Sequence, residues 1–174
     1  MAEVSLPMSI AMMPPALDDL YAQHNRLVFS AAYRITGSAA DAEDVLHTVF
    51  LRVLRGSVPT QNAEGYLRRA AVNAALDVVR ARRGSTDVEL ERMASGGRDG
   101  LDAVRDSELR AQLRAALATL PDRAAEVFVL RHFEGHTNPQ IARMLGISQI
   151  GVAVTLHRAR KKLQEELRKA GVRS

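Results

Sequence analysis

The chain has 174 residues with no cysteine and no tryptophan, a formal net charge of +4 and an isoelectric point near 9.9. The absence of cysteine excludes disulfides, thiolate metal sites and cysteine nucleophiles. Hydrophobic residues make up 47% of the chain but aromatic residues only 4%, which favours helices packed through leucine, valine, isoleucine and alanine. We expect an all-α protein. The basic balance suits a polyanionic partner, although an ordinary arginine-rich soluble protein has the same balance.

Residues 1–16 are apolar but contain Glu3 and no lysine or arginine. A secretory signal peptide begins with positive charge, so we interpret this segment as a disordered N-terminal tail. No apolar run approaches the roughly 18–20 residues that a membrane-spanning helix needs. We therefore expect a cytoplasmic protein that makes no membrane contact of its own.

Residues 17–83 are expected to form a first domain of three helices. The first runs from Leu17 to Ile35, and Ser38 caps the second, with Asp41 in a variant of the capping box. Glycine, proline and asparagine in residues 56–63 predict a loop, after which a third helix runs from about Ala63 to Arg83. The expected core stripes are Leu17, Leu20, Tyr21, Leu27, Val28, Ala31 and Ile35 in the first helix and Val45, Leu46, Val49, Phe50, Val53 and Leu54 in the second.

The third expected helix has a polar face, because Arg69, Asn73, Asp77 and Arg80 follow one another at spacings of three or four residues. Asn73 has no local reason to stand in the middle of a helix. On residue type alone, this face is either a solvated helix surface or a binding surface. Tyr66, near the start of the helix, is expected to be a core aromatic.

Residues 84–106 mix glycine, serine and charges with few large apolar side chains, which indicates a flexible linker. A second helical domain is expected over residues 107–170. Its first helix runs from near Ser107 to Leu120, and its second starts at Pro121 and ends near His132.

Residues 131–163 then have the outline of a helix-turn-helix. Thr137 and Gln140 form a capping box, Gly146 ends the first of the two helices and Ser148 caps the second. The second helix runs into a basic end, as expected for a recognition helix in the DNA major groove. Its predicted buried stripe is Val152, Leu156, Ala159 and Leu163.

Four segments resemble the extracytoplasmic-function, or group IV, sigma factors of bacterial RNA polymerase. GSAADAEDVLHTVFLR, within residues 17–55, is similar to the GxxxDAEDxxQExFLR of region two, and EGYLRRAAVNAALDVVRARR resembles the promoter-reading helix of that region. ATLPDRAAEVFVLRHFEGHTNPQIARMLGIS resembles the start of region four, and VAVTLHRARKKLQEEL its recognition helix. The segments stand in the family's order with a linker between them, so residues 17–83 correspond to region two and 107–170 to region four.

The resemblance implies three surfaces on this chain. The clamp coiled-coil of core polymerase is expected to bind Asp41, Asp44, His47, Thr48 and Arg52. The melted minus-ten strand is expected to bind Gln61, Asn62, Arg69, Asn73 and Arg80. The minus-thirty-five duplex is expected to bind Ser148, Gln149, Ala153, Thr155, His157, Arg158, Lys161 and Lys162, while region four also contacts the polymerase flap tip. An anti-sigma factor is a further expected partner.

Two of these surfaces depart from the family. His47 and Thr48 replace the usual Gln-Glu pair, and Ala153, Val154 and Thr155 replace the usual lysine, serine and arginine of the recognition helix. Arginine or lysine on guanine is the commonest specific base contact, whereas alanine and the threonine methyl suit thymine methyl groups. We expect an unusual or weakly discriminated minus-thirty-five sequence.

No nucleophile–base motif or phosphate-binding glycine loop is present, so we expect no enzyme activity and no cofactor. His132 and His136 stand four residues apart, but a stable metal site needs three or four ligands, and we expect no metal there. Two alternatives remain open. One is a stand-alone helix-turn-helix regulator, which would bind palindromic sites as a dimer. The other is a degenerate sigma factor that regulates by occupying polymerase.

Overall fold

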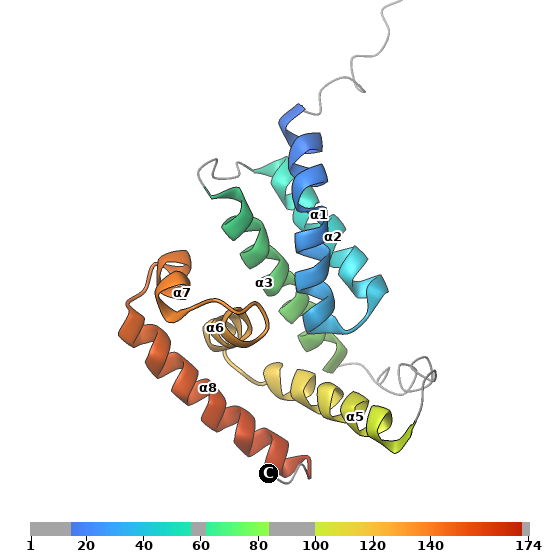
Figure 1. Cartoon of the computed structure of the whole chain (residues 1–174), viewed down its shortest axis with the longest axis vertical. Helices are drawn as coiled ribbons and strands as arrows, with labels where there is room; N and C mark the ends of the chain where they lie inside the picture. Colours follow the sequence, from blue (N-terminus) through green and yellow to red (C-terminus); the bar gives the residue numbers. More distant parts are fainter. Residues whose placement is uncertain (1–14, 57–61, 84–99, 172–174) are drawn as a thin grey trace, which may run out of the picture.

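A computed structural model describes the backbone of residues 15–56, 62–83 and 100–171, and the side chains of 17–56, 62–83 and 107–171. Over these ranges the chain forms seven helices and no strand, which confirms the expected all-α class (Figure 1). The helices are α1 (Pro15–Thr36), α2 (Ala39–Arg55), α3 (Ala63–Arg83), α5 (Gly100–Leu117), α6 (Asp122–His132), α7 (Asn138–Leu145) and α8 (Gln149–Lys169). None of the described helices is long and apolar enough to cross a bilayer.

Helices α1, α2 and α3 pack against one another as a first bundle. The chain turns from α1 to α2 at Gly37, whose φ of 70° is the left-handed conformation that glycine adopts without strain. Ser38 then caps α2 as predicted, because its hydroxyl accepts the Asp41 N–H at 3.3 Å. The bundle core consists of Leu17, Val28, Ala31, Ala32, Ile35, Ala42, Val45, Leu46, Val49, Phe50, Val53, Leu67, Ala71, Val72, Ala74, Ala75, Leu76 and Val79.

Three residues that we expected in this core are exposed. Tyr21 is 41%, Leu54 49% and Tyr66 38% exposed. Leu54 lies in the last turn of α2, so the helical periodicity that predicts its burial runs beyond the part of α2 that neighbouring helices cover. Tyr66, which was expected to be a core aromatic, lies in the first turn of α3. For Tyr66 the prediction of a core aromatic was wrong, and its ring is available at the surface.

The segment before the second bundle is more helical than its composition suggested. α5 begins at Gly100, well before the expected start near Ser107, so the last residues of the predicted linker belong to a helix. The sequence of this first part of α5 is rich in charges, and its helix therefore lacks the apolar stripe that would have indicated it.

Helices α6, α7 and α8 form the second bundle, with α5 against α8. The predicted stripe of Val152, Leu156, Ala159 and Leu163 is buried along α8. The turns are also as predicted. Thr137 and Gln140 make a reciprocal capping box, Gly146 ends α7 with a φ of 64°, and Ser148 caps α8.

The capping box at Thr137 gives the first testable prediction. A Thr137→Ala variant should lose about 1 kcal/mol of unfolding free energy, because the Gln140 N–H loses the side chain that accepts its hydrogen bond. Urea denaturation followed by circular dichroism measures the change. Thr137→Ser keeps the hydroxyl and should remain close to the parent protein, so an equal loss in both variants would show that the cap is not the cause.

The two bundles meet through α3, which contacts both α5 and α6 (Figure 1). This contact places part of the polar face of α3 next to α6, while the Asp77 side chain stays 65% exposed. The arrangement determines which of the predicted binding residues are free.

Candidate nucleic-acid interface

The first half of α8 presents an unusually apolar outer surface. Ile150 is 77% exposed and Val154 43%, although both are large hydrophobic side chains. Gln149, Ala153 and His157 are exposed beside them, while Thr155 is half-buried. An exposed apolar stripe at the start of a helix-turn-helix recognition helix is suited to contact with thymine methyl groups in the major groove.

The second half of α8 is basic. Arg158, Lys161 and Lys162 are exposed, whereas the Ser148 hydroxyl at the start of the helix accepts the Gly151 N–H at 3.0 Å. The side chains of Arg158, Lys161 and Lys162 are therefore available for phosphate contacts, which position a protein on DNA without reading its sequence. The structure assigns Ser148 the role of a helix cap.

The polar face of α3 is engaged by carboxylates of the second bundle. Arg69 Nε lies 2.6 Å from Glu126 Oε1, and Asn73 Nδ2 donates to the same oxygen at 3.1 Å. Arg80 pairs with Asp122 at 3.1 Å and more loosely with Asp77 at 3.5 Å. The structure thus brings three predicted minus-ten residues together on two carboxylates of α6, Glu126 and Asp122, that the sequence did not indicate as partners.

The N-terminal end of α3 has different contacts from its polar face. The Asn62 side chain accepts the Gly65 N–H at 3.1 Å and so serves as a helix cap, although it is exposed. Gln61 lies outside the described residues. The exposed ring of Tyr66 lies one turn into the helix, where it offers the stacking surface that a single-stranded base requires.

The outer face of α2 is open. Asp44, His47 and Arg52 are exposed and Thr48 is half-buried. Asp41 faces the bundle, since its carboxylate pairs with Arg82 of α3 at 2.6 Å, so the structure separates it from Asp44. A shallow cavity of about 380 Å³ lies beside this face and is lined mainly by apolar side chains, namely Leu17, Asp18, Tyr21, His47, Phe50, Leu51 and Leu54.

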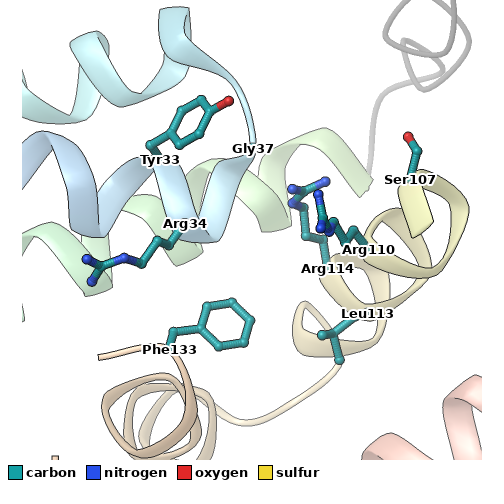
Figure 2. Close-up of a pocket in the computed structure, with 8 residues that line it drawn as sticks. All are labelled: Tyr33, Arg34, Gly37, Ser107, Arg110, Leu113, Arg114 and Phe133. Atoms are coloured by element: carbon teal, nitrogen blue, oxygen red, sulfur yellow. The ribbon is translucent and has the colours of Figure 1, made fainter. Parts of the chain in front are cut away.

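A second cavity, of about 570 Å³, lies between the two bundles (Figure 2). Arg114 of α5 reaches the end of α1, where its Nε donates to the Ile35 carbonyl at 3.1 Å. A Cβ on Gly37 would stand 2.0 Å from the Arg114 guanidinium, so this side chain would have to move, and the φ of 70° is the reason that glycine is favoured there. Arg34 and Phe133 line the same cavity from α1 and from the end of α6.

Glu134 joins the bundles at this end. Its carboxylate pairs with Arg34 of α1 at 2.9 Å and with Arg68 of α3. Arg68 also pairs with Glu64 one turn earlier, at 2.9 Å. The Glu134 side chain is fully buried, so these arginines provide the charge compensation that a buried carboxylate requires.

Two histidines of the second bundle, His132 and His136, are in environments that oppose protonation. Burial lowers the pKa of His132, and Arg160 and Arg131 lower it further. Arg160 Nη2 lies 3.3 Å from His132 Nε2, which must then be the acceptor because arginine only donates. Burial and Arg68 also lower the pKa of His136, and Glu134 opposes this only in part.

We therefore expect the unfolding free energy to fall as the pH decreases through about 6.5, where unfolded histidine gains its proton. The folded chain binds that proton only at lower pH, so stability that is present above this point is lost below it. Urea denaturation at about pH 7.5 and about pH 5.5 measures the difference. Replacing His132 and His136 together with glutamine should reduce this difference. Equal pH dependence in the parent and the double variant would contradict the assignment.

No group of three or more potential metal ligands occurs within the described ranges. The His132 ring packs on Phe128 with centroids 4.5 Å apart. The backbone N–H of His136 donates to the Leu130 carbonyl at 2.9 Å, while the His136 ring atom Nε2 is buried without a hydrogen-bond partner among the described residues.

Comparison with known proteins finds two sigma-factor regions in the chain. Residues 20–85 match the family described as sigma-70 region 2, and residues 110–163 match sigma-70, region 4. The ECF RNA polymerase sigma factor SigE of Mycolicibacterium smegmatis is 35% identical over 162 residues, which cover 89% of this chain and 63% of that protein. The chain thus spans somewhat less than two thirds of the length of that relative.

Other relatives match over more of their length. The RNA polymerase sigma-E factor of Streptomyces avermitilis is 34% identical over 79% of this chain and 76% of its own length. The RNA polymerase sigma factor CarQ of Myxococcus xanthus is 30% identical over 87% of this chain and 89% of its own length. With both sigma-70 regions matched and relatives of at least 30% identity over most of the chain, this protein belongs to the extracytoplasmic-function sigma factors of RNA polymerase.

Proposed function

We propose that this chain is an alternative sigma factor that directs core RNA polymerase to promoters and supports transcription initiation in the cytoplasm. The proposal rests on one observation: the same chain contains a region-two bundle and a helix-turn-helix whose recognition surface is exposed. The polymerase supplies the chemistry, so the chain itself needs no catalytic group and no cofactor.

The outer face of α2 is the proposed docking surface for the polymerase clamp. Asp44, His47 and Arg52 present charge and hydrogen-bonding groups there, and Leu51 adds an apolar side chain that is 50% exposed. Charged residues around an apolar patch are typical of a protein–protein interface. Asp41 contributes through its pair with Arg82, which fixes the end of α3 against α2.

The face and entrance of α3 are the proposed site for the melted minus-ten strand. Arg69 and Arg80 supply phosphate contacts, Asn73 supplies an amide for a base edge, and Tyr66 supplies a stacking surface. These are the groups that single-stranded nucleic acid requires. Asn62 and Gln61 would border the captured base.

The exposed side of α8 is the proposed reader of the minus-thirty-five duplex. Gln149 offers an amide suited to adenine, Ala153 and Ile150 offer apolar contacts to thymine methyls, and Arg158 and Lys161 hold phosphates. We further propose that the second bundle contacts the polymerase flap tip and that an anti-sigma factor binds the chain when it is inactive.

Transcription in vitro tests the proposal. Core polymerase is assayed with and without the chain on a library of upstream DNA regions. Discrete transcripts that require the chain would support a working sigma factor, and we expect their aligned starts to show weak discrimination at minus-thirty-five. Core binding without transcripts would favour a degenerate factor that occupies polymerase. Absence of core binding would favour a stand-alone regulator, and a strongly preferred guanine at minus-thirty-five would contradict our interpretation of α8.

A further inference from the structure

Helix α8 has a second stripe of side chains on the side opposite its buried stripe. The members of this outward stripe, which are all exposed, are Ile150, Val154, His157 and Lys161. Each stands two residues before a member of the buried stripe, which is a rotation of about 200° around the helix. Because α5, α6 and α7 contact α8 through its buried stripe, the outward stripe faces away from the rest of the molecule (Figure 1).

The outward stripe begins with apolar side chains and ends with basic ones. Ile150 is 77% exposed and Val154 43%, and neither belongs to the hydrophobic core that the described residues form. Residues 149–156 contain no charged side chain, whereas residues 157–162 contain two arginines and two lysines. Aliphatic side chains this exposed gain little free energy from folding, so their contribution depends on what they bind outside the chain.

Duplex DNA matches this order of apolar and basic groups. The N-terminal residues of a recognition helix contact base edges, and basic side chains can bind the phosphates beside them. The apolar group that a base edge presents in the major groove is the C5 methyl of thymine. Isoleucine and valine side chains have no hydrogen-bonding group, so Ile150 and Val154 can select a base only through such a methyl. The basic end of the helix favours a polyanion over an apolar protein surface as the partner.

A C5 methyl group also occurs on 5-methylcytosine, at the same position of the pyrimidine ring. We propose that Ile150 and Val154 make α8 a methyl reader, which binds thymine and 5-methylcytosine alike and binds less tightly when either base lacks its methyl. The inference rests on the proposed function only for the placement of α8 on the minus-thirty-five duplex. Methylation of a cytosine in that element would then increase the affinity of the chain for the promoter.

The size of a methyl contact agrees with weak discrimination at minus-thirty-five. Burying one carbon of this size changes an affinity by about fourfold. A bidentate pair of arginine with guanine discriminates by about 5- to 150-fold. A helix that selects bases through Ile150 and Val154 therefore distinguishes sequences by smaller factors than one with arginine at these positions.

The test uses the full chain assembled with core polymerase, on promoter duplexes recovered from the transcription library. Deoxyuridine replaces thymidine at single positions of the minus-thirty-five element, which removes the methyl and keeps the hydrogen-bonding groups of the base. We expect the affinity for a fluorescently labelled duplex to fall about fourfold at each contacted position. Where cytosine replaces a contacted thymine, 5-methylcytosine should bind about fourfold more tightly than cytosine.

Two substitutions in α8 link the effect to the proposed side chains. Ile150→Ala and Val154→Ala should each lose the difference between thymine and uracil at one position, because the side chain that contacts the methyl is absent. Both positions are exposed, so the variants should be folded, which circular dichroism checks. Leu109→Ala is the matched control, because it removes a 45% exposed aliphatic side chain of α5 and should leave the methyl effect unchanged.

Equal affinity for thymine and uracil at every position of the element overturns the inference, even if transcripts appear and the proposed function stands. A methyl effect that persists in both α8 variants, or an element composed only of G·C pairs, overturns it as well.

If core polymerase does not bind the chain, the same substitutions are made in sites that the full chain alone selects from random duplexes. A methyl effect there that Ile150→Ala or Val154→Ala removes supports the methyl reader, while the sigma-factor proposal fails. A chain that selects no duplex under either condition overturns the methyl reader.

Discussion

An Asp44→Arg variant is expected to lose most of its affinity for core RNA polymerase while remaining folded. Asp44 is exposed, and it lies beyond the first turn of α2, where the helix dipole has little effect on stability. Reversing its charge in a docking surface places repulsion where attraction is proposed. We expect at least about a tenfold loss of affinity, equivalent to roughly 1.4 kcal/mol.

Binding of a fluorescently labelled chain to core polymerase measures this effect, and circular dichroism shows that the variant is folded. Glu165→Arg is the matched control, because it makes the same change of charge on an exposed position of α8. An Asp44→Arg protein that is folded and binds core as tightly as the parent would remove the α2 face from the proposed interface.

Leu130→Ala should lower the free energy of unfolding by about 2–5 kcal/mol, the cost of deleting a fully buried leucine side chain. Leu130 is 0% exposed in α6, the helix that packs against both α7 and α8. Small domains are stable by only about 5–15 kcal/mol, so a loss of this size should disturb the packing that positions the helix-turn-helix. We expect promoter-dependent transcription to fall along with stability.

Urea denaturation of the parent and variant gives the free energies. Leu109→Ala is the control on α5, since the Leu109 side chain is 45% exposed and its loss should cost less than about 0.5 kcal/mol. A loss of similar size in both variants would contradict the assignment of Leu130 to the core of the second bundle.

The helix-turn-helix was predictable from sequence almost residue by residue, because local chemistry determines it. Thr137 and Gln140 cap α7 through bonds between residues three apart, and the positive φ at Gly146 needs only the absence of a side chain. The buried stripe of α8 follows from the helical period. None of these features depends on a distant part of the chain.

The acidic contact on α3 was not predictable in this way. Glu126 stands in the apolar segment AAEVFVL of α6, where sequence alone gives a charged residue no partner. Its partner Arg69 is 57 residues away, and the pair forms only because the two bundles pack together. The sequence indicated the polar face of α3, but only the packing of the two bundles shows that Glu126 contacts it.

Exposure at helix ends was the other limit of sequence reasoning. Helical periodicity placed Leu54 inward and Tyr66 was expected to be a core aromatic, yet burial depends on whether a neighbouring helix extends that far. The early start of α5 at Gly100 is a related case, because a charged helix without an apolar stripe resembles a linker in composition.

The open outer face of α2 has a consequence for how a transcription complex assembles. Asp44, His47 and Arg52 stay exposed while the second bundle lies against α3, so the proposed docking of polymerase on α2 needs no prior movement of either bundle. Association through this face would then take place between two preformed surfaces, and a rearrangement of the chain would not limit its rate.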